Sequence, residues 1–311
     1  MSETPPSTVD HALAKAKKLQ YWHIVSTIFI VAAMGAVMGQ SQTMKTAWIE
    51  DMLGLVPPIA FLVALRLERK SPSRRFPFGF DRANGLGFLV SAVALASVGL
   101  VLLWDAIMTL VAAQHATVGS IRMLGQEFWL GWLMLAVQAI AILPPLIIGR
   151  MELPLAKTLS DKLLHTDALM NKANWMTGAA GMAGIMGLGM GWWWADSVAA
   201  AIISLDIIHD GVTALRSATA ELADGTPRAL EGNDISEDAK KMERLLASRF
   251  PGADIKLRET GRLIRAEVHG AFPPENYSRR AHWPGDDENF WRLAQISFVP
   301  PETAQVPGKQ D

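Results

Sequence analysis

Six long apolar stretches, each about the length of a membrane-spanning helix, are the feature that most constrains this 311-residue chain. A helix that crosses a bilayer needs about 20 consecutive residues that are mostly apolar. Half of all residues are hydrophobic and the mean hydropathy is positive, which is unusual for a soluble protein of this size. The sequence therefore predicts an all-α membrane domain of six helices over residues 21–222. The predicted spans are Tyr21–Gly39, Thr46–Leu65, Leu86–Ala112, Phe128–Gly149, Leu164–Met190 and Trp193–Leu215.

The distribution of lysine and arginine predicts how these spans are oriented. Basic residues gather in the N-terminal segment 1–20 and in the loops 66–82 and 150–162, whereas the alternate loops contain few. Short loops rich in lysine and arginine stay on the cytoplasmic side of a membrane. We therefore expect an integral protein of the lipid bilayer, in a bacterial inner membrane, with both termini in the cytoplasm.

The composition changes after Asp224, and residues 223–302 have the pattern of a small soluble domain. Ile235–Phe250 is predicted to be an amphipathic helix, followed by strands at Asp254–Thr260, Leu263–Phe272 and Gln295–Val299. With a short helix near Trp291, this gives an α-β-β-α-β, ferredoxin-like order, for which we expect an antiparallel α+β domain in the cytoplasm. Residues 303–311 are predicted to be a disordered tail.

Two general features exclude some functions and some kinds of site. The chain has no cysteine, so it has neither disulfides nor thiolate metal ligands. Its formal net charge is −1, so nucleic acid is not an expected partner. We find no nucleophile and base pair of the kind that an enzyme would need, and we predict that the chain is not an enzyme.

Polar side chains inside the predicted second and fifth spans are the candidates for function, because charge within a bilayer is costly and is kept mainly where it acts. Glu50 and Asp51 are adjacent in the second span. Asp167, Asn171 and Asn174 follow the helical spacing i, i+4, i+7, so they share one face of the fifth span. Carboxylate and amide oxygens are ligands for hard divalent cations, and the thioether of Met170 would add a softer one.

Other polar groups in the spans have two interpretations each. Lys172 either neutralises Glu50 or Asp51 in a structural ion pair or serves as a site for a coupling proton. Asp206, His209 and Asp210 form either a second site or proton relay, or the solvated cytoplasmic end of the sixth span. His23, near the start of the first span, is expected at the membrane interface.

Proline pairs interrupt two of the predicted spans. Pro57–Pro58 lies in the second span and Pro144–Pro145 in the fourth. Proline removes helical hydrogen bonds and bends a helix. Each pair is either a packing kink or a hinge that opens a site to alternate sides of the membrane.

Three segments resemble motifs of the cation diffusion facilitator family. Arg75–Asn84, which reads R-F-P-F-G-F-D-R-A-N, is similar to the family's H-P-F-G-Y-G-R-A-E segment before the third span. Leu103–Ile107 is similar to its L-Y-E-A-I, and Trp194–Asp196 to the A-D that opens its sixth span. The resemblance covers nearly the whole chain and implies a homodimeric divalent-cation/proton antiporter with six spans and a cytoplasmic C-terminal domain.

The resemblance also implies where the transported cation binds. Members of the family hold metal between spans two and five on a D/H-x-x-x-D pair from each, and these positions correspond here to Glu50, Gly54, Met170 and Asn174. Because the usual histidine and two carboxylates are replaced, we expect an oxygen-rich site that suits Mn²⁺ or Fe²⁺ better than Zn²⁺, with Co²⁺ also among the candidate metals. The alternative is a membrane scaffold or metal-sensing partner that has the fold without transport.

Arg82 and Asp224 form a further candidate pair. They lie where the third span begins and where the sixth span ends. A charge interlock between them would tie the membrane domain to the soluble domain.

Overall fold

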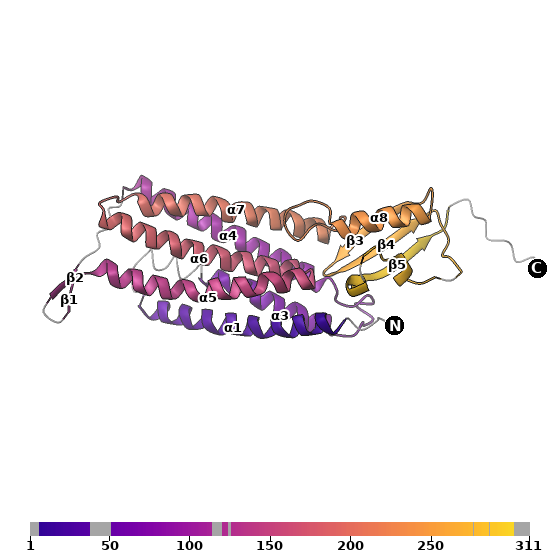
Figure 1. Ribbon diagram of the computed structural model, residues 1–311, viewed down its shortest axis with the longest axis horizontal. Helices are drawn as coiled ribbons and strands as arrows, with labels where there is room; N and C mark the ends of the chain where they lie inside the picture. The colour runs from indigo at the N-terminus through magenta and orange to yellow at the C-terminus, as the bar shows by residue number, and fades with distance from the viewer. Residues whose placement is uncertain are drawn as a thin grey trace, which may run out of the picture.

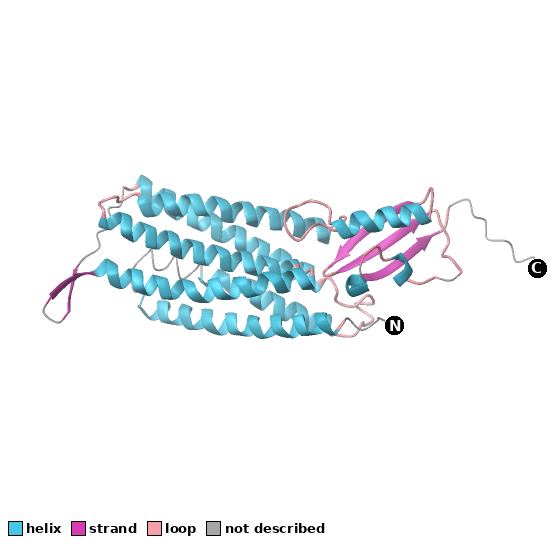
Figure 2. Cartoon of the chain, viewed as in Figure 1, coloured by secondary structure: helices cyan, strands magenta, loops and turns pink. Residues whose placement is uncertain are grey.

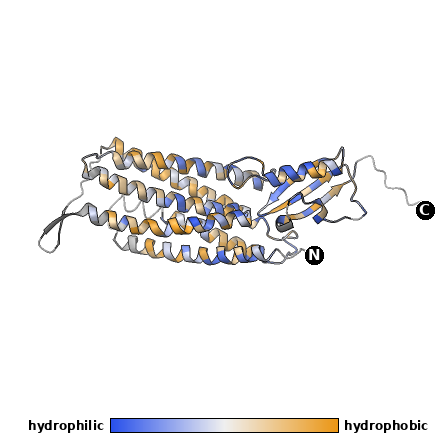
Figure 3. Ribbon diagram, viewed as in Figure 1, coloured by the Kyte–Doolittle hydropathy of each residue, from blue (hydrophilic) through white to orange (hydrophobic). Residues whose placement is uncertain are grey.

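The computed structural model shows an elongated molecule, with a bundle of long helices followed by a small α+β domain (Figure 1). It describes residues 6–37, 51–113, 120–123, 126–275, 277–285 and 287–301. Figure 3 shows apolar residues concentrated on the bundle and hydrophilic residues concentrated toward the α+β domain. The bundle contains α1 (Ser7–Val37), α3 (Val56–Glu68), α4 (Ala83–Val111), α5 (Leu130–Leu159), α6 (Lys162–Gly189) and α7 (Ala195–Leu222).

Three helices in the described part of the chain are both long enough and apolar enough to cross a membrane. Their apolar segments are Ala83–Val111, Gln138–Leu159 and Ser197–Leu222, with mean hydropathies of 2.5, 1.5 and 1.6. They lie in α4, α5 and α7, which correspond to the predicted third, fourth and sixth spans. α1 and α6 are 31 and 28 residues long but carry more polar side chains. The crossing of all six helices stays a prediction.

The fourth span differs from its predicted limits at both ends. A two-stranded antiparallel hairpin of β1 (Ser120–Met123) and β2 (Gln126–Trp129) precedes it, so Phe128 lies in a strand and α5 starts at Leu130. At its other end α5 continues beyond Gly149 to Leu159. This extension places Glu152 inside the helix, whereas the sequence analysis assigned this segment to a loop.

Close helix contacts hold the bundle together. A Cβ atom on Gly211 of α7 would lie 2.7 Å from Ala96 Cα of α4, and one on Gly99 of α4 would lie 2.9 Å from the backbone nitrogen of Ile208. Small residues allow such close approach between membrane helices. α5 and α6 lie side by side in the same way, with Gly149 against Asn171.

The first proline pair interrupts the second span. Residues 51–54 form a helical turn, Leu55 is outside the helix, and α3 begins at Val56 with Pro57 and Pro58 in its first turn. The missing proline N–H groups explain the break, because carbonyls of the preceding turn lose their donors. Pro144 and Pro145, in contrast, lie inside α5, which remains one helix. Whether either pair acts as a hinge stays a hypothesis.

The C-terminal domain contains a mixed sheet (Figure 2). α8 (Glu237–Arg249) starts at Ser236, whose hydroxyl accepts a hydrogen bond from the Ala239 amide. β3 (Asp254–Thr260) pairs antiparallel with β4 (Leu263–His269), and β4 pairs parallel with β5 (Leu293–Val299). The predicted fully antiparallel sheet is therefore wrong, because the crossover between β4 and β5 returns the chain in the same direction. Two 3₁₀ helices, η1 (Arg280–His282) and η2 (Asp287–Arg292), stand where the second helix was expected. The predicted tail lies outside the described residues.

The turn between β3 and β4 docks onto the end of the bundle nearest the α+β domain, here called the proximal end. Gly261 in this turn has φ +61°, and a Cβ atom there would lie 2.7 Å from the Asp81 carbonyl oxygen. Its amide donates to Glu221 Oε1 at the end of α7, over 3.0 Å. The turn therefore requires glycine both for its backbone conformation and for its contact.

Charged residues reinforce this junction. Arg262 pairs with Glu68 at the end of α3, and its Nε lies 3.4 Å from Asp161 Oδ2, just before α6. Lys162, the first residue of α6, pairs with Glu259 of β3. All five side chains are 20% exposed or less. The α+β domain is thus joined to the ends of α3 and α6 by mostly buried ionic contacts, and to the end of α7 by the hydrogen bond from Gly261 to Glu221.

Candidate metal centre

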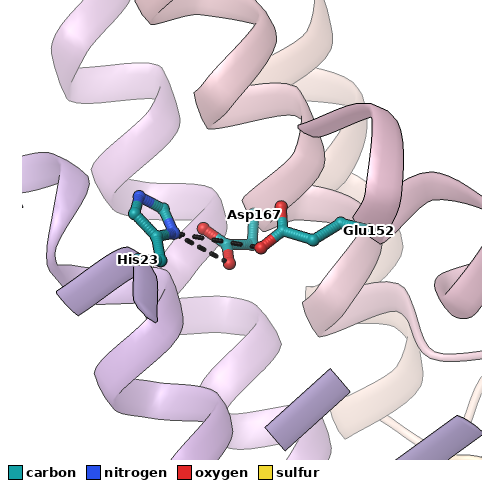
Figure 4. Close-up of side chains that lie close together, drawn as sticks. All are labelled: His23, Glu152 and Asp167. Carbon is teal, nitrogen blue, oxygen red and sulfur yellow. Dashed lines mark ion pairs between the residues drawn. The ribbon is translucent and has the colours of Figure 1, made fainter. Parts of the chain in front are cut away.

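Three helices bring one imidazole and two carboxylates together inside the bundle (Figure 4). His23 comes from α1, Glu152 from α5 and Asp167 from α6. His23 Nδ1 lies 3.5 Å from Asp167 Oδ2 and 3.9 Å from Glu152 Oε1. The side chains of His23, Glu152 and Asp167 are 3%, 0% and 0% exposed. We call this group the acidic triad.

Two amide side chains complete the surroundings of the triad. Gln20 Nε2 donates to Glu152 Oε1 over 2.7 Å, and Asn171 Nδ2 donates to Glu152 Oε2 over 3.0 Å. Both Glu152 oxygens are therefore held in place. The amide oxygens of Gln20 and Asn171 are left free to accept.

Several buried atoms at this site have no hydrogen-bond partner in the described part of the chain. They are Gln20 Oε1, His23 Nδ1, both carboxylate oxygens of Asp167, and Asn171 Oδ1. Leaving a buried polar atom unpaired costs about 1–3 kcal/mol, and more for a charged group. Apart from the imidazole nitrogen, whose role depends on its tautomer, all these atoms are acceptors. Unpaired acceptors of this kind are the atoms that bind a cation.

The geometry fits a divalent metal. Two ligands on one first-row metal, each about 2.0–2.2 Å from it, lie no more than about 4.4 Å apart. The separations of 3.5 and 3.9 Å from His23 Nδ1 to the two carboxylates fall within this limit. Two carboxylates balance the charge of a divalent ion. An imidazole nitrogen with carboxylate and amide oxygens is a donor set that suits Mn²⁺, Fe²⁺, Co²⁺ and Zn²⁺.

A cavity of about 220 Å³, lined by both polar and apolar side chains and here called the polar cavity, adjoins His23 of the triad. His23 and Asn171 line its inner part, and Asp51, Asn174 and Thr177 line its walls farther from the α+β domain. A Cβ atom on Gly54 would lie 3.5 Å from Asn174 Nδ2, so the turn that carries Asp51 packs against α6. The second and fifth predicted spans thus face each other across this cavity.

On the other side of the triad, the proximal half of the bundle is closed by apolar packing. Leu19, Phe61, Phe88, Leu163 and Leu164 are all buried in one hydrophobic cluster there. The triad therefore meets the cavity through His23, and apolar side chains pack in the half of the bundle nearer the α+β domain.

Two further residues predicted for the metal site are Glu50 and Met170. Glu50 lies outside the described residues. Met170 is fully buried in an apolar cluster with Leu95 and Val98 of α4 and Ile207 of α7, away from the triad. The structure therefore places Asp51, Asn171 and Asn174 at the cavity that His23 lines, whereas Met170 packs in an apolar cluster.

Lys172 lies on the side of α6 that faces α7. Its ammonium group is 2.8 Å from Asp206 Oδ2 and 3.0 Å from Asp210 Oδ2. Asp206 and Asp210 are one helical turn apart, and His209 between them is exposed. The structure pairs Lys172 with these two acids rather than with Asp51.

Arg82 and Asp224 form an ion pair, and Arg82 Nη1 also donates to the Leu222 carbonyl over 3.2 Å. Arg258 Nη1 of β3 lies 3.4 Å from the same Asp224 carboxylate. The contact joins the start of α4, the exit of α7 and the sheet.

Three members of the site differ from what the sequence predicts. The sequence predicts a loop at Glu152, although Leu153, Pro154 and Leu155 continue the apolar pattern after Arg150. His23 was expected at the membrane interface, but it is 3% exposed inside the bundle. Gln20 was taken as the end of a polar segment. All three lie on helices that extend beyond the apolar core of their spans, where hydropathy gives little signal.

Comparisons with known proteins agree on one family. A family model described as the cation efflux transmembrane domain matches residues 21–223. The manganese efflux system protein MneS of Bacillus subtilis is 23% identical over 248 residues, which cover 78% of this chain and 79% of that protein. A cadmium, cobalt and zinc/H(+)-K(+) antiporter of Bacillus velezensis is 23% identical over 239 residues, covering 75% and 72%. Its counterpart in Bacillus subtilis is 21% identical over 214 residues, covering 68% and 64%.

Proposed function

Because this chain belongs to the cation efflux family, and is therefore an integral membrane protein and not an enzyme, we propose that it exports a divalent metal cation in exchange for protons. The proposal includes six membrane-crossing helices, with the turn at residues 51–54 and α3 together forming the second. It places both termini in the cytoplasm of a bacterial cell, and two copies in a homodimer.

The observation that carries the proposal is the set of unpaired buried atoms around the acidic triad. His23, Glu152 and Asp167 supply the charge and the imidazole, and Gln20 and Asn171 orient Glu152 while their own oxygens remain available. A structural ion pair would have left these acceptors satisfied. We propose that the transported cation binds here. On α6, Asp167 and Asn171 each lie three residues before the positions that the family uses, Met170 and Asn174.

The polar cavity is the proposed route between this site and the far side of the membrane. Asp51 and Asn174 line its walls and would replace part of the water that the cation carries. Carboxylate and amide oxygens are suitable for that exchange because they resemble water as ligands. The oxygen-rich site between spans two and five that the sequence predicts thus becomes the outer part of a longer path.

The donor set favours Mn²⁺ or Fe²⁺. One nitrogen and several oxygens make the site harder than a histidine-rich zinc site. A manganese efflux protein among the relatives supports this choice, whereas the two antiporters named for cadmium, cobalt and zinc show that related chains accept softer ions.

Exchange for protons follows from the ligands themselves. A carboxylate or imidazole binds metal only in its deprotonated form, so cation binding releases protons and protonation releases the cation. If the site opens alternately to the two sides of the membrane, this competition between the cation and protons for the same ligands produces antiport. The break at Leu55 before Pro57 and Pro58 is the proposed hinge.

We expect that the double substitution Glu152→Gln with Asp167→Asn lowers Mn²⁺-dependent proton flux in proteoliposomes at least tenfold. Both substitutions keep the shape of the side chain and remove the negative charge that balances the cation. Flux would be followed with an internal pH dye, and Fe²⁺, Co²⁺ and Zn²⁺ would be compared at equal concentration. Asp254→Asn, an exposed change in the α+β domain, is the matched control.

Two outcomes would refute the proposal. Unchanged flux in the double variant would remove the triad from the transport site. Binding of Mn²⁺ by the unmodified protein without any flux would instead favour the scaffold or metal-sensing alternative.

A further inference from the structure

An apolar groove of about 600 Å³ runs along the outside of the bundle between α1 and α5. Trp22 of α1 and Leu143, Ile147 and Met151 of α5 line it. These four side chains are 40–63% exposed, with Trp22 at 63% and Met151 at 40%. In a membrane protein such a surface faces lipid.

Two lysines stand at one end of this groove. Lys15 and Lys18 also line it, and they are separated by three residues on α1, so their side chains are neighbours. Neither has an ion-pair partner within the described part of the chain. Lys18 precedes the first predicted apolar residue, Tyr21, by three residues, or about 5 Å of helix. This is the depth at which phospholipid headgroups meet the hydrocarbon core.

We infer that this groove binds one anionic phospholipid. The phosphate would pair with Lys15 and Lys18, and an acyl chain would lie along α5 in the apolar part of the groove. Basic pockets between membrane helices on the cytoplasmic side are suited to anionic headgroups, because each nearby lysine attracts them. A zwitterionic lipid fits the groove equally well but lacks the net charge.

The groove is close to the candidate metal centre. Pro144 and Ile148 line both the groove and the polar cavity, so a single layer of side chains separates the two. Leu19 and Trp22, which line the groove, adjoin Gln20 and His23 along α1. A bound lipid would therefore brace α1 against α5, the helices that supply His23 and Glu152. The inference concerns binding and stands whether or not the chain transports a cation.

A second groove offers an internal comparison. It lies between α1 and α3, has a volume of about 400 Å³, and is lined by Lys17, Tyr21, Arg66 and Arg69 among others. Lys17 lies over the Tyr21 ring, 5.9 Å from its centroid. This groove carries three basic side chains, one more than the α1–α5 groove, on another face of the same helix.

The test is a titration of the full chain in non-ionic detergent, followed by native mass spectrometry. Phosphatidylglycerol and phosphatidylcholine with identical acyl chains are the probes. We expect one retained phosphatidylglycerol per chain and weaker retention of phosphatidylcholine. Lys15→Gln with Lys18→Gln should weaken phosphatidylglycerol binding roughly 25-fold, about fivefold for each lysine.

Two further variants separate the groove from general electrostatics. Lys17→Gln with Arg69→Gln removes the same charge from the α1–α3 groove and should change phosphatidylglycerol binding by less than about twofold. Leu143→Trp keeps every charge but fills the groove, and it should reduce binding of both lipids. Equal losses in the two charge variants, or equal retention of both lipids by the unmodified chain, would mean ordinary annular lipid only and would overturn the inference.

Discussion

Neighbouring residues of α6 perform different tasks because each step along a helix turns the side chain by about 100°. Asp167 belongs to the triad, and Asn171 donates a hydrogen bond to Glu152 of the triad. Met170 is buried against α4 and α7, and Lys172 pairs with two acids of α7. The same helix therefore carries a polar site, an apolar contact and an ion pair. The effect of a substitution in α6 therefore depends on which face of the helix carries the substituted residue.

Gly261 gives a prediction at the residue scale. We expect Gly261→Ala to destabilise the protein more than Gly252→Ala. Both glycines have positive φ, so an alanine at either would cost about 1–2 kcal/mol. A Cβ atom on Gly261 would in addition lie 2.7 Å from the Asp81 carbonyl oxygen, whereas nothing lies within 4 Å of one on Gly252.

The measurement is thermal unfolding in detergent, followed by tryptophan fluorescence. The extra cost at Gly261 should be roughly 1–3 kcal/mol, as for other overpacked positions. Equal melting temperatures for the two variants would show that the turn does not dock as tightly as described.

At the scale of elements, the β3–β4 turn connects helices that are far apart in the sequence. Arg262 joins the end of α3 to the residue before α6. The cavity is lined by residues of α6 and by Asp51, in the turn that precedes α3. Movement of α3 relative to α6 at the proximal end would therefore break or rearrange the contacts of Arg262. The α+β domain is in a position to influence which side of the bundle opens.

We expect Arg262→Gln to destabilise the folded chain by about 3 kcal/mol, because it leaves Glu68 and Asp161 without their buried partner. Arg265→Gln is the matched control, since Arg265 pairs with the more exposed Asp81 over 2.9 Å. Its loss should cost about 1 kcal/mol or less. The melting temperature and the rate of proteolysis between α7 and α8 would report both effects, and similar values for both variants would contradict this account.

At the scale of the whole molecule, the proposed six-span topology places the α+β domain in the cytoplasm and the far end of α6 outside the cell. Because the chain contains no cysteine, single cysteines can be labelled without background. In intact cells, a membrane-impermeant maleimide should label Met190→Cys, near the far end of α6. It should label Ser248→Cys, in α8, only after the membrane is permeabilised.

Both positions tolerate the change, since Met190 is 62% exposed and Ser248 lies on an exposed part of α8. Labelling of Ser248→Cys in intact cells would contradict cytoplasmic placement of the α+β domain. Protection of Met190→Cys from the outside would contradict the six-helix topology.

The sequence alone determined the class of protein and much of the polar face of α6. Long apolar runs and the loop motifs are local features, so they can be read without coordinates. Asp167 and Asn171 were identified by helical spacing because that spacing depends only on the helix that carries them. The sheet, in contrast, was predicted to be fully antiparallel, because strand direction depends on how the β4–β5 crossover folds back.

Only the tertiary structure decided which side chains surround the candidate metal centre. His23 and Glu152 meet Asp167 although 129 residues separate the first two in sequence and different helices carry all three. Each of them alone resembles an interfacial polar residue, since a single helix cannot show what its neighbours present. The site is therefore a property of three helix faces in contact, and its unpaired acceptors become visible only when those faces are brought together.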